Sequence, residues 1–374
     1  MEIGVANRQE YEKIQRFLED AYGHSRNYFP NFYPQVWRED TTDYQHTLVA
    51  REGNRIISLV RIFPMKLVQE GIPLMVAGIG GVSTSPEYRG QGHMSSLMSQ
   101  ALQVMEKEGF PLSVLWGDRH RYSHFGYENG GCLIEIQITA RGLSKIESPS
   151  LQVCRYQGQP RVLDQMLALN QQNPFHKQRT REEMARMLER IGLNSYYVEN
   201  GHELAYACFS GERGGDDLVE FGGPTHLVFS ILKQHQQRFG LQGFTLRYPM
   251  TKYVPPEVLE AASSWWFRAV GMLKVISLKS LLQTYQGFLQ SALPENFCLT
   301  LKREQEPPVK FGWQKGEFIV EEGNETEAIC LTDQELVRLL FGPDIWFPEA
   351  KARKNISLSQ IKPLPFFVWI LDHI

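Results

Sequence analysis

An arginine and two glycines stand directly before an amphipathic helical pattern, and this combination is suited to binding phosphate. The loop of residues 89–92 reads Arg-Gly-Gln-Gly and follows an extended run that ends at Thr84. Apolar residues then recur every three or four positions, which predicts a helix with one face packed on a sheet. They are Met94, Leu97, Met98, Ala101, Leu102 and Met105. Such a helix begins with unpaired backbone N–H groups and a partial positive charge, to which Arg89 adds a full charge.

Other phosphate-binding motifs do not fit this segment. A Walker loop needs GxxxxGK followed by Ser or Thr, which the chain lacks here. The glycines Gly78, Gly80 and Gly81 lie within the extended run, so they do not form a dinucleotide-binding turn between a strand and a helix. Nucleoside triphosphates and dinucleotides are therefore disfavoured. A surface turn with a chance Arg-Gly pair is the simpler alternative.

The elements around the loop follow a regular order. A helix is predicted after Asn7 and Glu10, which match a capping box. Strands are predicted at residues 46–52 and 55–70, around a Gly-Asn turn, and the extended run of residues 72–84 is a third. After the amphipathic helix, residues 110–116 read as a buried strand. With a strand at the N-terminus, the order is strand, helix, three strands, helix, strand.

This order and the spacing Arg89-x-x-Gly92 resemble motif A of the GNAT acetyltransferases. The consensus of that motif is Gln/Arg-x-x-Gly-x-Gly/Ala, and its backbone amides hold the pyrophosphate of acetyl-CoA. Met94 departs from the final Gly/Ala. In the superfamily the strands on either side of the motif helix splay apart, which frees strand amides for the pantetheine arm. The resemblance therefore implies a set of coenzyme-binding residues: Val82, Ser83, Thr84, Arg89, Gly90, Gln91, Gly92, His93 and Met94.

The segment of residues 117–128 follows the last predicted strand and carries a tyrosine three residues before Phe-Gly-Tyr. Together with the loop and an apolar C-terminus, it resembles the Eis (enhanced intracellular survival) family of GNAT acetyltransferases. In that family the first tyrosine is the general acid that reprotonates the leaving thiolate, and Tyr122 matches it. A phenol with a pKa near ~10 is protonated at neutral pH yet can donate to a thiolate whose thiol has a pKa of ~8.5. A packing role for Tyr122, and acid–base roles for His120 or His124, are the alternatives.

The chain ends in an apolar run, residues 363–374, that is expected to be buried. In the Eis family the C-terminal carboxylate enters the active site as general base, and the α-carboxylate of Ile374 corresponds to it. Asp372, His373 and Asp118 are rivals for that role. No cysteine lies in a recognisable nucleophile motif, which favours direct acetyl transfer in a ternary complex.

The predicted fold class is α+β, with tandem GNAT folds. Residues 1–146 would be the catalytic GNAT domain and residues 147–270 a second, degenerate one. The second unit repeats the hairpin, strand, glycine turn and helix, but its turn at residues 222–224 has no arginine. A second cofactor site there is the alternative. After Pro255 the apolar spacing predicts a helix that carries Trp265 and Trp266. Residues 271–374 resemble the sterol-carrier-protein-like third domain of the Eis family.

The composition of the chain excludes several classes of protein. A net charge of −3 offers no footprint for nucleic acid, and no apolar run reaches the ~18 residues of a membrane helix. The N-terminus lacks a signal-peptide pattern, and the five dispersed cysteines disfavour a metal site or disulfides, so we expect a cytoplasmic protein without metal. Residues 24–43 are rich in aromatic residues and end in the acidic group Glu39, Asp40 and Asp43. They either form a pocket wall for an amine or pack the connection onto the core.

We therefore expect an N-acetyltransferase that moves acetyl from acetyl-CoA to a primary amine. The resemblance implies an aminoglycoside, a polyamine or a similar small molecule, or a peptide, as the acceptor. It also implies a homo-oligomer such as a hexamer. A non-catalytic acyl-CoA or lipid-binding sensor is the hypothesis from another class.

Overall fold

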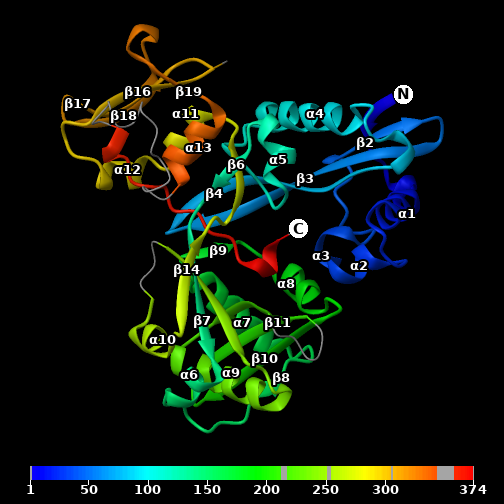
Figure 1. The fold of residues 1–374 in the computed structure, drawn as a ribbon, viewed down its shortest axis with the longest axis vertical. Coiled ribbons are helices and arrows are strands. Elements are labelled where there is room, and N and C mark those ends of the chain that lie inside the picture. The colour runs from blue at the N-terminus through cyan, green and yellow to red at the C-terminus, as the bar shows by residue number, and fades with distance from the viewer. Residues whose placement is uncertain (1, 212–216, 251–253, 305, 343–357, 374) are drawn as a thin grey trace.

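The computed structural model describes all residues except 1, 212–216, 251–253, 305, 343–357 and 374. Figure 1 shows three lobes, which we name by their main residues: an N-terminal lobe (2–130), a middle lobe (133–268) and a C-terminal lobe (278–341). A tail, residues 358–373, runs from the C-terminal lobe to the space between the other two.

An eight-stranded sheet forms the centre of the N-terminal lobe, in the order β1-β2-β3-β4-β5-β15-β6 with β9 paired to β3. Its strands are β1 (Glu2–Val5), β2 (Thr47–Glu52), β3 (Arg55–Gln69), β4 (Ile72–Thr84), β5 (Leu112–Leu115), β6 (Glu128–Gly130), β9 (Phe175–Lys177) and β15 (Gly271–Val275). The predicted hairpin and the strands on either side of the motif helix are confirmed. The sheet also crosses the predicted boundary at residue 271, because β15 pairs with both β5 and β6.

The strands β4 and β5 are parallel and separate before β4 ends. Their last paired residues are Ile79 and Leu115, whereas β4 continues to Thr84. On its other edge β4 stays paired with β3 as far as Thr84, through a bulge opposite residues 59–61. The edge of β4 that faces β5 is therefore open beyond Ile79.

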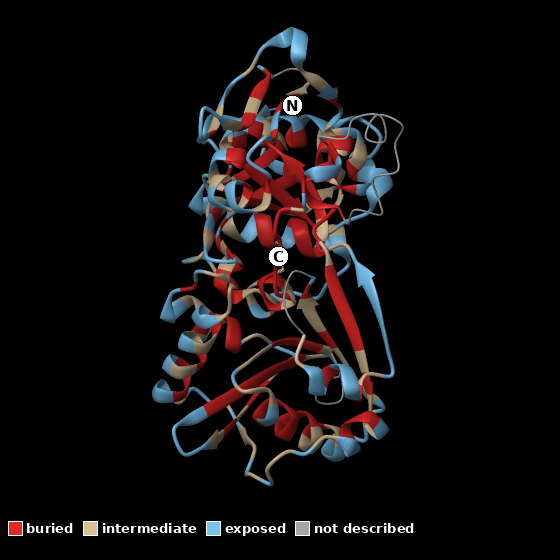
Figure 2. Cartoon of the chain, turned by 90° about the vertical axis from the view of Figure 1, so that its left-hand side faces the viewer, coloured by how far each residue is buried: buried red, intermediate tan, exposed pale blue. Residues whose placement is uncertain are grey.

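Five helices accompany this sheet: α1 (Tyr11–Tyr22), α2 (Tyr28–Phe32), α3 (Pro34–Trp37), α4 (His93–Lys107) and α5 (Arg119–Tyr122). The predicted apolar face of α4 is confirmed: Leu97, Met98, Ala101 and Met105 are fully buried against the sheet. Figure 2 shows buried residues along the central strands and exposed residues on the outer helices and turns.

The middle lobe holds a four-stranded and a three-stranded sheet, in the orders β12-β11-β10-β8 and β13-β7-β14. Its elements are β7 (Leu133–Thr139), α6 (Ala140–Lys145), β8 (Cys154–Arg155), α7 (Pro160–Gln172), α8 (Arg181–Leu188), β10 (Leu193–Asn200), β11 (Glu203–Ser210), β12 (Asp217–Gly222), α9 (Thr225–Phe239), β13 (Gly243–Pro249), α10 (Pro256–Ala261) and β14 (Ser264–Arg268). The strand of residues 133–139 lies within the predicted catalytic domain, residues 1–146, but does not join the N-terminal sheet. This strand, β7, pairs with β13 and β14 instead.

The predicted helix after Pro255 is too long. It ends at Ala261, and Trp265 and Trp266 lie on β14, where they are 55% and 41% exposed. Aromatic residues favour strands, and the pairing of β14 with β7 prevails over the helical spacing.

The C-terminal lobe contains α11 (Leu278–Thr284), α12 (Gln286–Ala292), β16 (Cys298–Arg303), β17 (Val309–Gln314), β18 (Glu317–Glu322), β19 (Ile329–Leu331) and α13 (Asp333–Phe341). A capping box of Thr332 and Glu335 begins α13. The apolar tail is buried as predicted, and Gln69 of β3 exchanges two hydrogen bonds with the backbone of Phe367.

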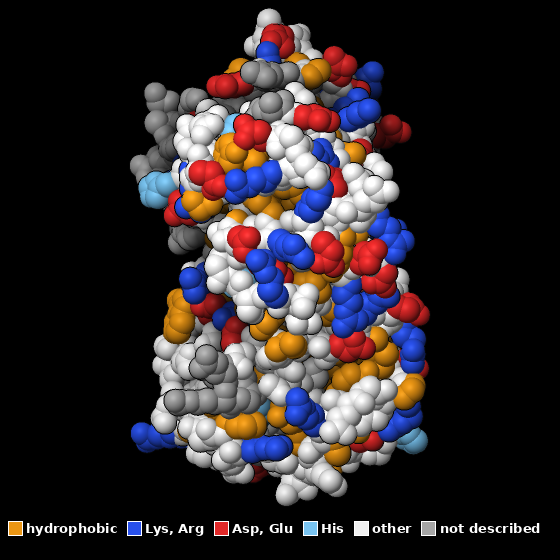
Figure 3. Space-filling view, turned by 90° about the vertical axis from the view of Figure 1, so that its right-hand side faces the viewer, with side chains coloured by type: hydrophobic (Ala, Val, Ile, Leu, Met, Phe, Trp, Pro, Cys, Tyr) orange, Lys and Arg blue, Asp and Glu red, His pale blue; other side chains and the backbone are white. Residues whose placement is uncertain are grey.

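On the face shown in Figure 3, basic and acidic side chains are interspersed. Among the described residues, no helix is long and apolar enough to cross a membrane.

Candidate active site

The first turn of α4 is open to a ligand. No side chain caps this helix, and its N-cap Gly92 has φ 81°, in the left-handed region that glycine tolerates. Gly90 has φ 77°, and a Cβ at either glycine would meet nothing within 4 Å. A ligand can therefore approach the backbone N–H groups of the loop closely, with the positive end of the helix dipole behind them.

A pocket of about 750 Å³ lies at this helix end, and we name it the α4 pocket. Its lining comprises Ala21, Tyr22, Val82, Ser83, Thr84, Tyr88, Arg89, Gly90, Gly92, His93, Met94, Ser95 and Arg121. Eight of the nine expected coenzyme-binding residues thus lie together. Gln91 is the exception, since its side-chain amide donates to the Glu87 carbonyl oxygen (3.2 Å) and is not part of the lining.

The α4 pocket joins two sources of hydrogen-bond donors and charge. Val82, Ser83 and Thr84 come from the part of β4 that has separated from β5. The sequence did not indicate that Arg121 of α5 would add a second guanidinium to that of Arg89. Two cations and a helix N-terminus in one pocket favour a polyanionic ligand.

Tyr122 is buried, with 7% of its surface exposed; it follows the pocket-lining residue Arg121 in sequence but does not itself line the α4 pocket. Its ring occupies the space beside Gly117, where a Cβ would come within 2.5 Å of a Tyr122 ring carbon. Burial raises the pKa of Tyr122, and the neighbouring Arg121 cation offsets part of that rise. The phenol is therefore protonated at neutral pH, as a proton donor must be.

Tyr22, on α1, is a pocket residue that sequence reasoning missed. Its hydroxyl donates to the Val82 carbonyl oxygen (3.0 Å). Burial, with a smaller contribution from the neighbouring phenol of Tyr122, raises its pKa to about 12. Tyr22 therefore lies at Val82, on the part of β4 beyond its last pairing with β5.

The tail reaches the place where β4 and β5 separate. Trp116 directly follows β5, and the His373 ring stacks on its indole at 3.9 Å between ring centroids. The ring also hydrogen-bonds the Val368 backbone, while Nε2 is buried without a partner among the described residues. Burial lowers the pKa of His373 to about 4. The next residue, Ile374, whose carboxylate is the expected base, lies outside the described residues.

A buried ion cluster anchors this end of the tail. The side chains of Arg179, Glu220 and Asp372 are 0%, 0% and 1% exposed. Arg179 donates through two nitrogens to each carboxylate, and the Tyr206 hydroxyl donates to Glu220 (2.8 Å). Asp372 is therefore committed to Arg179.

The other rivals are placed less favourably. Asp118 is exposed and caps α5, accepting from the Arg121 backbone N–H (3.0 Å). His120 and His124 are exposed on the same loop and do not line the α4 pocket. Among the described residues, His373 is the one rival for the acid and base roles with a buried atom that lacks a hydrogen-bond partner. Its ring lies on Trp116, where β4 and β5 have separated.

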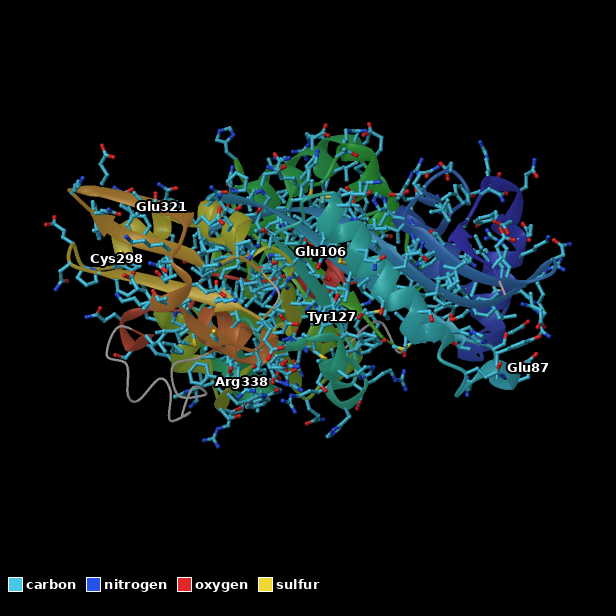
Figure 4. All side chains as sticks on the ribbon, turned by 90° about the horizontal axis from the view of Figure 1, so that it is seen from above. Glu87, Glu106, Tyr127, Cys298, Glu321 and Arg338 are labelled. Carbon is cyan, nitrogen blue, oxygen red and sulfur yellow. The ribbon has the colours of Figure 1, made fainter. Side chains whose placement is uncertain are left out.

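The C-terminal lobe supports the Tyr122 loop from behind. Gln334 of α13 donates to the Ser123 carbonyl oxygen (2.5 Å), and Arg338 lies 3.4 Å from the Glu128 carboxylate, which Arg119 also binds. Figure 4 labels Arg338 by the C-terminal lobe and Tyr127 nearer the centre, with Glu106 and Glu87 toward opposite ends of α4.

A second pocket, of about 630 Å³, lies beside the tail, and we name it the tail pocket. Its lining comprises Tyr28, Phe32, Tyr33, Arg190, Ile191, Gly192, Leu193, Ser210, Gly211, Val219, Ile370, Leu371 and His373. The aromatic residues of segment 24–43 therefore do form a pocket wall.

The acidic group of the same segment does not take part in this wall. Glu39 pairs with Arg8, Asp40 with Arg186, and Asp43 with His46. These carboxylates lie outside the lining of the tail pocket, so of the pocket-wall alternative only the aromatic part is found.

The glycine turn of the middle lobe is filled by protein. A Cβ at Gly222 would lie 2.6 Å from the Tyr206 ring, and one at Gly223 would lie 2.4 Å from the Leu204 carbonyl oxygen. These glycines allow close packing between strands and leave no room there for a coenzyme.

Residues 2–130 match the family model of the acetyltransferase (GNAT) domain. No curated protein matches the sequence. A probable N-acyltransferase from Enterococcus faecalis V583 has a similar structure at 17% identity and a TM-score of 0.73, over 100% of this chain and 99% of the other. A GCN5-related N-acetyltransferase from Anabaena variabilis (19%, TM-score 0.71) and Eis1 from Mycobacterium abscessus (13%, TM-score 0.69) align over 100% of both chains.

At these identities the structural likeness shows the fold alone. The domain match shows that the chain carries a GNAT acetyltransferase domain, and the protein is an acyltransferase enzyme. GNAT domains use acetyl-CoA as co-substrate.

Proposed function

We propose that the protein transfers acetyl from acetyl-CoA to the primary amine of a small molecule or peptide, directly and within a ternary complex. One observation carries this proposal: the uncapped N-terminus of α4 and the open edge of β4 line the same pocket. The first suits a pyrophosphate and the second a pantetheine arm, and together they lead toward the junction of β4 and β5.

In this proposal the backbone amides of Gly90, Gly92 and Met94, with Arg89, hold the pyrophosphate. Val82, Ser83 and Thr84 face the pantetheine arm, and His93 lines the same wall. The amine nitrogen attacks the thioester carbonyl carbon and the carbon–sulfur bond breaks. The departing thiolate takes a proton from Tyr122, and the nitrogen loses one to a base.

We propose the α-carboxylate of Ile374 as that base. Two features of the described tail support it: Asp372 is anchored by Arg179, and His373 stacks on Trp116 beside the separated strands. His373, the residue before Ile374, therefore lies beside Trp116, directly after β5. Burial there would raise the pKa of a carboxylate and make it a better proton acceptor.

We further infer an Eis-like organisation for the whole chain. It is supported by alignment over the full length with Eis1 and by the filled glycine turn of the middle lobe, which fits a degenerate GNAT copy. Under this inference the C-terminal lobe is sterol-carrier-protein-like, and the enzyme is a cytoplasmic homo-oligomer such as a hexamer.

The test is the release of coenzyme A thiol from acetyl-CoA, measured with and without an added amine. We expect release that depends on the amine and falls strongly in Tyr122→Phe and in a chain that lacks Ile374. The exposed His120→Ala is the matched control on the same loop, and it should keep full turnover. Coenzyme binding without release for any amine would favour the sensor hypothesis instead.

A further inference from the structure

Among the described residues that line the tail pocket, Arg190 is the one with a permanent charge, and that charge is positive. His373 is the other titratable residue of the lining. Three aromatic rings, from Tyr28, Phe32 and Tyr33, and several aliphatic side chains form the rest of the wall. No described carboxylate lines it. A polycationic acceptor would meet a like charge here and, among the described lining residues, no carboxylate.

Protein contacts hold the Arg190 side chain in place, and they use only two of its three guanidinium nitrogens as hydrogen-bond donors to described residues. Its Nε donates to the Phe32 carbonyl oxygen (2.6 Å), its Nη1 donates to the Leu371 carbonyl oxygen (2.9 Å), and its guanidinium lies over the Tyr33 ring at 4.6 Å. Within the described residues, no carboxylate forms an ion pair with it and Nη2 makes no hydrogen bond. Burial lowers the pKa of Arg190, but the group stays charged. A fixed guanidinium with a free edge suits a ligand carboxylate.

His373 supplies a second polar atom to the lining of the tail pocket. The Val368 backbone binds one ring nitrogen, so Nε2 keeps a lone pair that no described group satisfies. A buried acceptor without a partner is unfavourable unless a ligand donates to it. An amine N–H beside the separated strands is such a donor.

These two groups and the aromatic wall point to one class of acceptor. We infer that the tail pocket binds an amine that also carries a carboxylate and an aromatic or aliphatic body, as in an apolar amino acid. Arg190 binds the carboxylate, Tyr28, Phe32 and Tyr33 contact the body, and His373 Nε2 accepts from the amine. This inference rests on the proposed acetyl transfer and specifies its acceptor.

The first experiment compares matched acceptors with the wild-type chain and acetyl-CoA. L-Phenylalanine, L-phenylalaninamide and spermidine are tested by amine-dependent thiol release. We expect kcat/KM for phenylalanine to exceed that for the amide and for spermidine by about tenfold or more, the factor of a charge-assisted contact. Equal rates for acid and amide, or a preference for spermidine, would overturn the inference alone. No acetylation of any amine would overturn the proposed function and this inference with it.

The second experiment replaces the guanidinium. Arg190→Gln should raise KM for phenylalanine with little change in kcat, and should bring the acid-to-amide ratio down to about one. Arg38→Gln, which removes a partly exposed arginine paired with the adjacent Glu189, is the control and should keep the wild-type ratio. An unchanged ratio in folded Arg190→Gln would refute the role of Arg190. If Arg190→Gln does not fold, the comparison of the three acceptors with the wild-type chain still tests the inference.

Discussion

Replacing Arg179 by methionine removes the guanidinium that neutralises two buried carboxylates. Glu220 and Asp372 are 0% and 1% exposed, so water cannot replace the lost partner. Breaking a buried ion pair by removing one partner costs about 3–5 kcal/mol. Because whole domains are stable by only ~5–15 kcal/mol, the loss should be plain in urea and thermal unfolding.

The matched control is Arg181→Met. Arg181 pairs with Asp164, but both side chains are about half exposed, at 46% and 58%. An exposed pair contributes ~0–1 kcal/mol, so this variant should unfold close to the wild type. Equal stability of Arg179→Met and Arg181→Met would refute the reasoning about the buried cluster.

A milder change separates stability from tail position. Asp372→Asn keeps the Arg179–Glu220 pair but removes the charge that ties the tail to it. We expect most of the stability to remain while amine-dependent turnover falls and acetyl-CoA affinity is unchanged. Wild-type turnover in Asp372→Asn would show that this anchor does not position the chain end.

Three further changes test other parts of the site. Arg89→Ala should weaken acetyl-CoA binding about tenfold in calorimetry, less so at high salt, whereas the exposed Arg8→Ala should not. Gly117→Ala places a Cβ 2.5 Å from the Tyr122 ring, so kcat should fall ~10–100-fold while coenzyme affinity persists. A normal kcat would contradict the placement of Tyr122. Because the pKa of His373 is lowered to about 4, the unfolded chain binds protons first and stability should fall as pH drops from ~6.5 toward 4. The stability of His373→Gln should fall less steeply than that of the wild type across this pH range. Identical stability profiles for the two chains would refute the role of His373 in the pH dependence.

The sequence predicted the part of the site that lies within one local stretch. The apolar spacing from Met94 to Met105 defined α4, and the glycines before it marked the open helix end. Both features depend on neighbours along the chain, which periodicity and backbone preferences describe well.

The sequence did not predict the contacts between distant segments of the chain. Arg179 meets Asp372 across 193 positions, and nothing near Arg190 in sequence indicates that it faces Tyr33. The pairing of β14 with β7 likewise turned a plausible helical pattern at Trp265 into a strand. Such choices depend on packing partners that a single sequence does not reveal.

The most direct test of the central claim is a crystal structure of the protein with acetyl-CoA. We predict that the pyrophosphate lies on the backbone amides of residues 89–94 and that the thioester lies at the open edge of β4, toward Tyr122. Coenzyme bound elsewhere, for instance in the tail pocket, would contradict the account.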